Sequence, residues 1–120
     1  HFAKELKDRQ EVADRYSNSL SKILQTPVIK PDRSSAWAQY TLRVKNRDTL
    51  QLKLKENGIP TSIFYPIPLH LQECLKYLNY KQNNFPISEK ASKEVISIPM
   101  NPFLTNEQID YVVKILSEKK

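Results

Sequence analysis

A tyrosine and a histidine on one stiff segment are the residues of this chain best suited to chemistry. The run Phe64-Tyr65-Pro66-Ile67-Pro68-Leu69-His70-Leu71-Gln72 contains two prolines separated by one residue. Each proline fixes its own φ at about −65° and pushes the preceding residue out of the helical region. We therefore expect an extended segment that holds the phenol of Tyr65 and the imidazole of His70 at a set separation. The plainer interpretation is a strand end with an incidental histidine. The run alone favours it, because a lone histidine is a weak sign of a site.

Other residue types that carry chemistry are scarce. Cys74 is the only cysteine, so the sequence can form neither an internal disulfide nor a zinc cluster of cysteines, and a reducing cytosol is favoured. Gly58 is the only glycine, which excludes a glycine-rich phosphate loop, a dinucleotide fingerprint and a nucleophile elbow from this sequence. Most nucleotide and hydrolase sites are thereby excluded as self-contained units.

Composition narrows the class of protein. A chain of 120 residues with 39% hydrophobic residues suits one domain with a core. The net charge of +6 is spread along the whole chain, and the aromatic residues are not interleaved with the basic ones. We interpret this charge as solvated surface, not as a nucleic-acid interface. No apolar run approaches the ~20 residues of a membrane helix, and no signal peptide is visible. We expect a cytoplasmic protein that binds neither nucleic acid nor membrane.

The first half of the chain predicts a long helix and a strand. Apolar residues at helical spacing predict a helix over residues 2–24, with Pro27 beyond its end. Residues 36–44 alternate as a strand does. One face of this strand predicts core, and the other carries Trp37, Gln39, Thr41 and Arg43. Because Trp37 stands among polar groups there, we expect that face to be incompletely covered within this chain and to serve as an interface.

The second half predicts shorter elements. We expect a helix over residues 46–57, capped by Asn46 and ended by Gly58, and a short strand over 61–65. A helix over 71–78 should bury Cys74, and Ser88 should cap a brief helix that ends at residue 94. A strand over 95–100 then leads to a last helix, which opens with the capping box Thr105-Asn106-Glu107-Gln108 and buries Ile109, Val112, Val113 and Leu116. This order predicts an α+β two-layer sandwich, a small antiparallel or mixed sheet with helices on one face.

Five stretches in order resemble the C-terminal small domain of the DegT/DnrJ/EryC1/StrS sugar aminotransferases. They are residues 35–44 (SAWAQYTLRV), 54–61 (LKENGIPT), 65–72 (YPIPLHLQ), 85–100 (FP at its start, SIPM at its end) and 104–109 (LTNEQI). Upstream, residues 9–16 and Leu20 resemble the linking helix of the family. Each stretch alone is weak, but five in the family's order are specific.

The resemblance implies a domain of a longer enzyme. It implies that residues 1–26 are a linking helix and residues 27–120 the small domain of a fold-type I enzyme whose large domain is absent from this sequence. Such enzymes depend on pyridoxal phosphate, are usually homodimers, and transfer an amino group, commonly from glutamate, to a ketone on a nucleotide-linked sugar. No lysine here matches the family's Schiff-base motif, so the resemblance assigns pyridoxal phosphate to the large domain. It assigns no catalytic, cofactor-binding or metal-binding residue to this chain, and it suggests polysaccharide biosynthesis as the context.

The resemblance also names substrate-side residues. His70, Tyr65 and Gln39 match family positions near the sugar, where imidazole, phenol and amide groups suit hydroxyl and phosphate oxygens. Trp37 either lines the same cleft or packs on the large domain, and packing is favoured. Two alternatives stay open: a sugar dehydratase of the same family, and a stand-alone α+β module that binds acidic partners. The sequence does not decide which sugar, nucleotide or carbon is involved.

Overall fold

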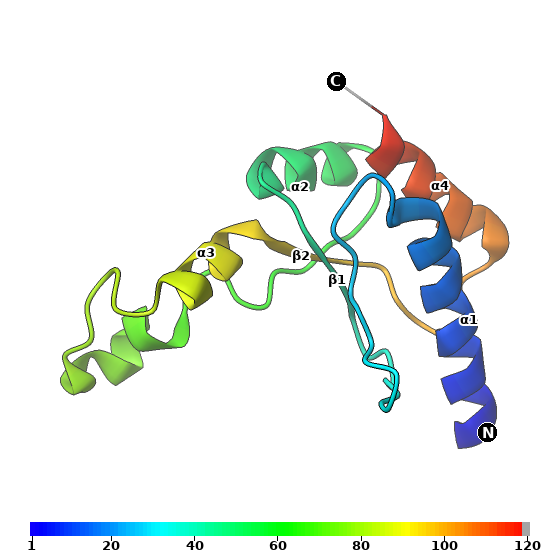
Figure 1. Cartoon of the computed structure of the whole chain (residues 1–120). Helices are drawn as coiled ribbons and strands as arrows, with labels where there is room; N and C mark the ends of the chain where they lie inside the picture. The colour runs from blue at the N-terminus through cyan, green and yellow to red at the C-terminus, as the bar shows by residue number, and fades with distance from the viewer. Residues whose placement is uncertain (119–120) are drawn as a thin grey trace.

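The computed structural model describes residues 1–118 as a body with a projecting arm, measuring 47 × 37 × 24 Å. The elements in order are α1 (Phe2–Leu20), β1 (Tyr40–Arg43), α2 (Arg47–Glu56), the 3-10 helices η1 (Leu69–Leu71) and η2 (Glu73–Leu78), α3 (Pro86–Glu94), β2 (Val95–Ile98) and α4 (Asn106–Ser117). Figure 1 shows α1, α2 and α4 around the two strands, while residues 65–94, here called the arm, extend away from them. The predicted α+β fold with a small antiparallel sheet is confirmed.

Within residues 1–118, the sheet consists of β1 and β2. Tyr40 lies opposite Ile98 and Leu42 opposite Ile96, and all four side chains are buried. The strand predicted over residues 61–65 is wrong, because only one bridge forms there, between Ser62 and Ser97. Pro60 and Pro66 flank this stretch and have no N–H to donate to a neighbouring strand. The strand predicted over 95–100 ends early at Ile98, since Pro99 also lacks that donor.

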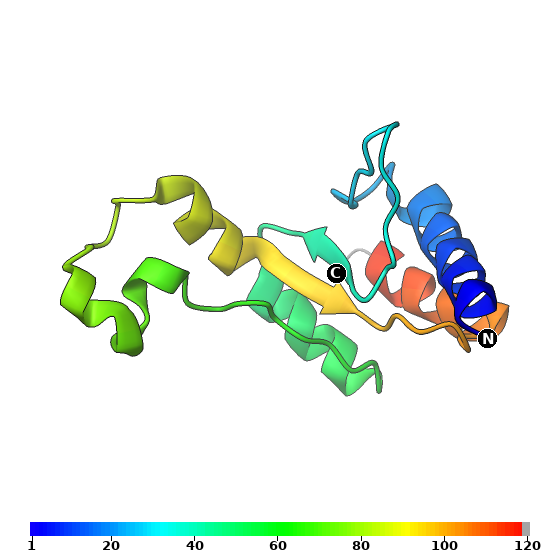
Figure 2. The same ribbon diagram turned by 90° about the horizontal axis from the view of Figure 1, so that it is seen from below.

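The core of the body joins α1, α4 and the sheet. Helix α1 buries Val12, Ala13, Tyr16 and Leu20, and α4 buries Ile109, Val112, Ile115 and Leu116. This spacing of three and four residues places each set on one face of its helix. The hydroxyl of Tyr16 donates to the carbonyl of Pro99 over 2.8 Å, and both ends of the Arg15 fork donate to Asp110. Figure 2 shows α1 lying along α4 as these contacts require. Helix α1 ends at Leu20, before the predicted end at residue 24, and Phe2 and Ile23 are exposed.

Trp37 contradicts the prediction of an uncovered strand face. Its side chain is only 5% exposed, stacks on Tyr40 with ring centroids 5.5 Å apart, and donates its indole N–H to Gln10 over 2.9 Å. The carbonyl of Trp37 accepts from Arg9, and its φ of +49° breaks the strand, so β1 begins at Tyr40 and not at residue 36. The positive φ directs Trp37 toward α1 within this chain. Trp37 therefore gives no support to a missing domain over the sheet.

Of the three helix-end features expected from the sequence, two are present in the structure and one is absent. The capping box of α4 is confirmed, with Thr105 accepting from the Gln108 N–H and Gln108 accepting from the Thr105 N–H. Gly58 follows α2 at a φ of +75°, the left-handed conformation that glycine adopts without strain. The side chain of Asn46, the expected cap of α2, makes no capping hydrogen bond.

The arm is built from tighter turns than predicted. Residues 69–78 form η1 and η2 in place of one α-helix, and Cys74, expected in the core, is exposed. A short 3-10 helix stacks every third residue and so does not gather Leu71, Cys74, Leu75 and Leu78 on one buried face. Helix α3 begins with Pro86 after Phe85, so Ser88 is not its cap. Within residues 1–118, no helix is long and apolar enough to cross a membrane.

Candidate functional site

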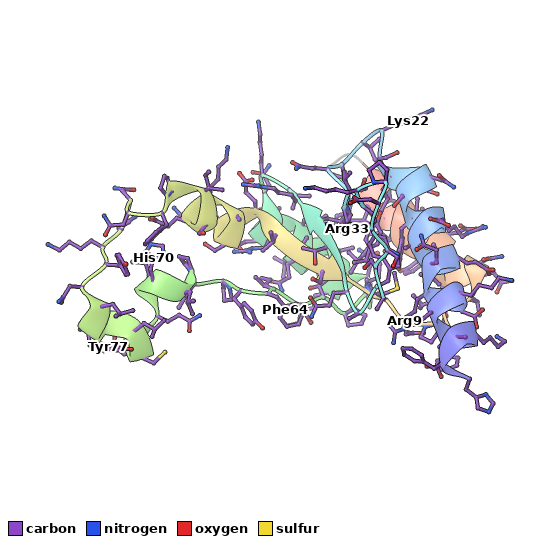
Figure 3. All side chains as sticks on the ribbon, turned by 60° about the horizontal axis from the view of Figure 1, so that its bottom comes forward. Arg9, Lys22, Arg33, Phe64, His70 and Tyr77 are labelled. Carbon is purple, nitrogen blue, oxygen red and sulfur yellow. The ribbon has the colours of Figure 1, made fainter. Side chains whose placement is uncertain are left out.

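The proline-rich segment leads from the body into the arm. Pro68 is extended, with φ −63° and ψ 151°, as predicted for this stretch, and η1 starts directly after it. Tyr65 is 65% exposed, whereas His70, in the middle of η1, is buried. Figure 3 shows Phe64 on the connection to the body and His70 within the arm, with Tyr77 toward the arm's far end. The segment thus presents an open phenol and a covered imidazole.

His70 is held by a small cluster of polar and aromatic groups. Its Nε2 lies 3.2 Å from Oε2 of Glu89, and its ring meets the ring of Phe85 edge to face with centroids 4.8 Å apart. The ring of Phe85 also packs edge to face against the ring of Tyr80, with centroids 5.0 Å apart. Side-chain exposure is 7% for His70 and 10% for Glu89. We call His70, Glu89, Asn83 and Phe85 the clasp.

Glu89 is the centre of the clasp. Its Oε1 accepts from the Asn83 N–H at 2.8 Å, and its Oε2 accepts from the Phe85 N–H at 3.1 Å as well as from His70. The Asn83 N–H does most to hold the pKa of Glu89 below its ordinary value; the Phe85 N–H and His70 add to it, and desolvation opposes it. Glu89 is therefore a charged acceptor whose bonds fold the loop before α3 onto η1.

Gln39 and Tyr65 line two neighbouring hollows that share Phe64. The first, of about 340 Å³, lies between the sheet and the start of the arm and is lined by Ala38, Gln39, Pro60, Thr61, Ser62, Phe64, Ser97, Ile98, Pro99 and Met100. The second, of about 590 Å³, lies along the arm and is lined by Phe64, Tyr65, Ile67, Pro68, Leu69, Gln72, Ala91, Ser92 and Val95. The structure thus places Gln39 and Tyr65 on either side of Phe64. His70 lines neither hollow and stands apart in the clasp.

Lys4, Lys53 and Lys76 do not fit a Schiff base with pyridoxal phosphate, because each amine already has a partner within the described residues. Lys53 is partly buried, but its Nζ donates to the carbonyls of Ile115 and Glu118, both at 2.9 Å, at the end of α4. Lys4 and Lys76 pair with neighbouring acids on the surface. Gly58 is the only glycine of the sequence, so no glycine-rich loop is present to hold the phosphate. Among residues 1–118, no cluster of three or more potential metal ligands occurs either.

Sequence reasoning missed Glu89 and Arg47. A signal existed for Glu89, since an acid in the first turn of a helix that opens with proline can reach back to free N–H groups. Arg47 is buried and donates to the carbonyls of Ser92 and Val95, at 2.8 and 2.9 Å, where α3 meets β2. Nothing in its local sequence distinguishes it from a surface arginine.

The model of the DegT/DnrJ/EryC1/StrS aminotransferase family matches residues 1–117. A pleiotropic regulatory protein of Geobacillus stearothermophilus is 40% identical over 122 residues, covering 98% of this chain and 33% of that protein. A UDP-2-acetamido-2-deoxy-3-oxo-D-glucuronate aminotransferase of Pseudomonas aeruginosa is 38% identical over 117 residues, covering 97% of this chain and 32% of that protein. The chain therefore spans about a third of the length of these relatives.

Solved structures agree with the fold. The crystal structure of DesV from S. venezuelae in complex with a ketimine intermediate superposes with a TM-score of 0.89 at 28% identity. The superposition covers 93% of this chain and 31% of DesV. The fold of this chain therefore also occurs as part of a larger protein.

Proposed function

Because this chain belongs to the DegT/DnrJ/EryC1/StrS aminotransferase family, we propose that it is the small domain of a longer enzyme that transfers an amino group to a keto group on a nucleotide-linked sugar. The observation that carries this proposal is the match over residues 1–117, nearly the whole chain, to a region that makes up a third of its relatives. The P. aeruginosa relative is named for transfer to an oxo sugar attached to UDP. We propose residues 1–26, which contain α1, as the segment that links to the large domain.

The two hollows around Phe64 are the part of this chain that we assign to the substrate. Gln39 offers an amide and Tyr65 an exposed phenol, and each can donate and accept hydrogen bonds to sugar hydroxyls or phosphate oxygens. Phe64 between them offers an apolar surface. We also retain His70 as a substrate-side residue that acts from the clasp.

The cofactor and partners follow from the same proposal. Pyridoxal phosphate would be bound by the large domain, since the amine of Lys53 is occupied by backbone carbonyls and the sequence has no glycine-rich loop to hold the phosphate. The enzyme would use glutamate as the amino donor, act as a homodimer in the cytoplasm and supply polysaccharide biosynthesis, with neither nucleic acid nor membrane as a partner. A dehydratase of the same family is the second candidate. Its distinguishing feature would be the residue at the Schiff-base position of the large domain.

The first prediction concerns His70 in the full-length enzyme. His70→Ala should lower kcat/KM for the nucleotide sugar, because one hydrogen bond to substrate is lost, worth about 0.5–1.5 kcal/mol if neutral and about 1.5–3 kcal/mol if charged. The cofactor absorbance and the half-reaction with glutamate should remain unchanged, since neither involves His70. Tyr65→Phe should act in the same direction but more weakly, because the ring remains.

Tyr77→Phe is the matched control, since Tyr77 is an exposed phenol on η2 outside both hollows. Single-turnover kinetics of both half-reactions, with melting temperatures, separate the outcomes. A lower melting temperature with unchanged sugar kinetics would make His70 a structural residue only. An enzyme that aminates no keto sugar with any variant, wild type included, would refute the proposed function.

A further inference from the structure

We infer that Glu89 is a positioning residue for the sugar-binding step, which holds His70 in the Nε2–H form so that Nδ1 meets the substrate as a hydrogen-bond acceptor. This inference rests on the proposed function, because it names how His70 would act there. Glu89 itself touches no substrate in this account. Its effect reaches the substrate only through the imidazole.

The direction of the His70–Glu89 hydrogen bond follows from what surrounds the carboxylate. Oε1 already accepts from the Asn83 N–H, and Oε2 already accepts from the Phe85 N–H. Both backbone groups are donors only, so they favour the ionised carboxylate, which has no proton to give. The lowered pKa of Glu89 has the same cause. Nε2 of His70 must therefore donate the 3.2 Å bond.

The other ring nitrogen is then free for substrate. The side-chain bonds of His70 within residues 1–118 involve Nε2 and not Nδ1. No fully enclosed side-chain nitrogen or oxygen in the described part of the chain lacks a hydrogen-bond partner, so Nδ1, which has none, is not completely enclosed. Phe85 covers the ring edge to face, which limits how far the imidazole can turn. When the ring is neutral, this form offers one lone pair, at Nδ1, in a fixed direction.

This arrangement selects the chemistry of the group that His70 meets. A lone pair on neutral Nδ1 attracts a donor, such as a sugar hydroxyl, and repels an anionic phosphate oxygen. We therefore assign His70 to a hydroxyl of the sugar and not to the diphosphate of the nucleotide. Without Glu89, the ring could exchange its two neutral forms. In the Nδ1–H form, it could no longer accept a hydrogen bond from that hydroxyl.

Nitrogen NMR of the full-length enzyme tests the geometry directly. With histidine labelled with ¹⁵N, the two neutral forms of imidazole give different nitrogen shifts, and His70→Ala identifies the His70 signals. In mildly alkaline buffer, wild-type His70 should show a protonated Nε2 and a bare Nδ1. Glu89→Gln should give a mixture of both forms, because an amide can donate as well as accept. A wild-type ring with the proton on Nδ1 would overturn the inference without touching the proposed function.

Kinetics of the same variants test the consequence for substrate. Glu89→Gln should lower kcat/KM for the nucleotide sugar about three- to tenfold, the effect of weakening one hydrogen bond, and leave the glutamate half-reaction unchanged. In the His70→Ala background, Glu89→Gln should not lower kcat/KM for the nucleotide sugar any further, since Glu89 acts through His70. Glu89→Asp keeps the charge and should recover part of the loss.

Glu94→Gln is the matched control for Glu89→Gln. Glu94 is also a partly buried carboxylate on α3, but it accepts from Arg43 at 2.7 Å and does not contact His70. Glu94→Gln should leave the sugar kinetics and the His70 signals unchanged, even where the substitution lowers the melting temperature. If Glu89→Gln lowers kcat/KM for the nucleotide sugar as much in the His70→Ala background as in wild type, the role of Glu89 is only structural. The positioning inference is then wrong. If His70→Ala leaves sugar kinetics unchanged while the wild type aminates the sugar, the inference fails and the proposed aminotransferase stands.

Discussion

Glu89 shows how one side chain can join parts of the arm that are distant in sequence. Its carboxylate accepts hydrogen bonds from His70 in η1 and from the backbone N–H groups of Asn83 and Phe85, which precede α3. Each donor would otherwise need water or another acceptor in a partly buried place. The carboxylate therefore stabilises the folded arm most strongly while it is ionised.

Acid should accordingly weaken the clasp. The folded-state pKa of Glu89 lies below its ordinary value, so the unfolded chain takes up a proton first as the pH falls. The stabilisation from Glu89 should be fully present above the ordinary carboxyl pKa and disappear as the pH falls through the lowered, folded-state pKa. Melting temperatures of the wild type and Glu89→Gln should thus differ at neutral pH and converge in acid.

The exposed Glu56, at the end of α2, gives a control of the same change in charge. Glu56→Gln should track the wild type over the whole pH range. A gap between wild type and Glu89→Gln that stays constant from neutral to acidic pH would show that the carboxylate of Glu89 contributes packing and no charge-dependent stability.

Among the elements, the junction of α3 and β2 depends on Arg47. This buried arginine, the first residue of α2, donates to the carbonyls of Ser92 and Val95 and to Asp48. The last carbonyls of a helix have no partner within the helix, and a cation placed there satisfies them. Arg47 thereby connects α2 with the base of the arm.

Arg47→Met should destabilise the protein that contains this chain. The substitution keeps most of the apolar volume but leaves two carbonyls without their charged donor, at a cost of about 1.5–3 kcal/mol. Arg33→Met is the matched control, because Arg33 is exposed on the loop after α1 and pairs only with Asp32; its effect should stay within about 0.5 kcal/mol. Denaturant unfolding would measure both, and equal costs would contradict a role for Arg47 at the junction.

The sequence predicted those elements whose signals are local. The apolar spacing in α1 and α4, the capping box at Thr105 and the turn at Gly58 all depend on residues within a few positions of one another. The errors arise where distant residues decide. Trp37 is drawn toward Gln10 and Arg9 of α1, which alternation in the strand cannot reveal. The spacing around Cys74 predicts a buried helix face, but the short 3-10 helices do not form one and Cys74 is exposed.

The candidate site also combines features that are local in sequence with features that are not. The extended segment before His70 is predictable from Pro66 and Pro68, because proline restricts its own backbone and that of the preceding residue. The bond from His70 to Glu89 spans 19 positions, and its carboxylate is fixed by two backbone N–H groups that carry no side-chain signal. Residue types alone therefore proposed His70 but not the group that orients it.

At the scale of the whole molecule, the body and the arm differ in how they bury apolar side chains. The buried hydrophobic residues belong to the body, while the arm exposes Tyr65, Ile67, Leu69, Tyr77, Tyr80 and Ile87. Figure 1 shows that the arm projects beyond the helices of the body. An apolar arm of this kind is consistent with the proposal that the chain is one domain of a larger enzyme.

The same division predicts what this domain does when it is alone. We expect the isolated chain, mixed with pyridoxal phosphate, to show no stoichiometric imine in its absorbance spectrum. The partly buried amine of Lys53 is occupied by two carbonyl oxygens, and the chain has no glycine-rich loop to hold the phosphate. Near-ultraviolet circular dichroism provides the necessary control, because the buried Trp37, stacked on Tyr40, gives a signal only when the core is folded. A folded chain that forms one imine at one lysine would show that this domain carries its own cofactor site, and it would remove the reason for assigning that site to a large domain.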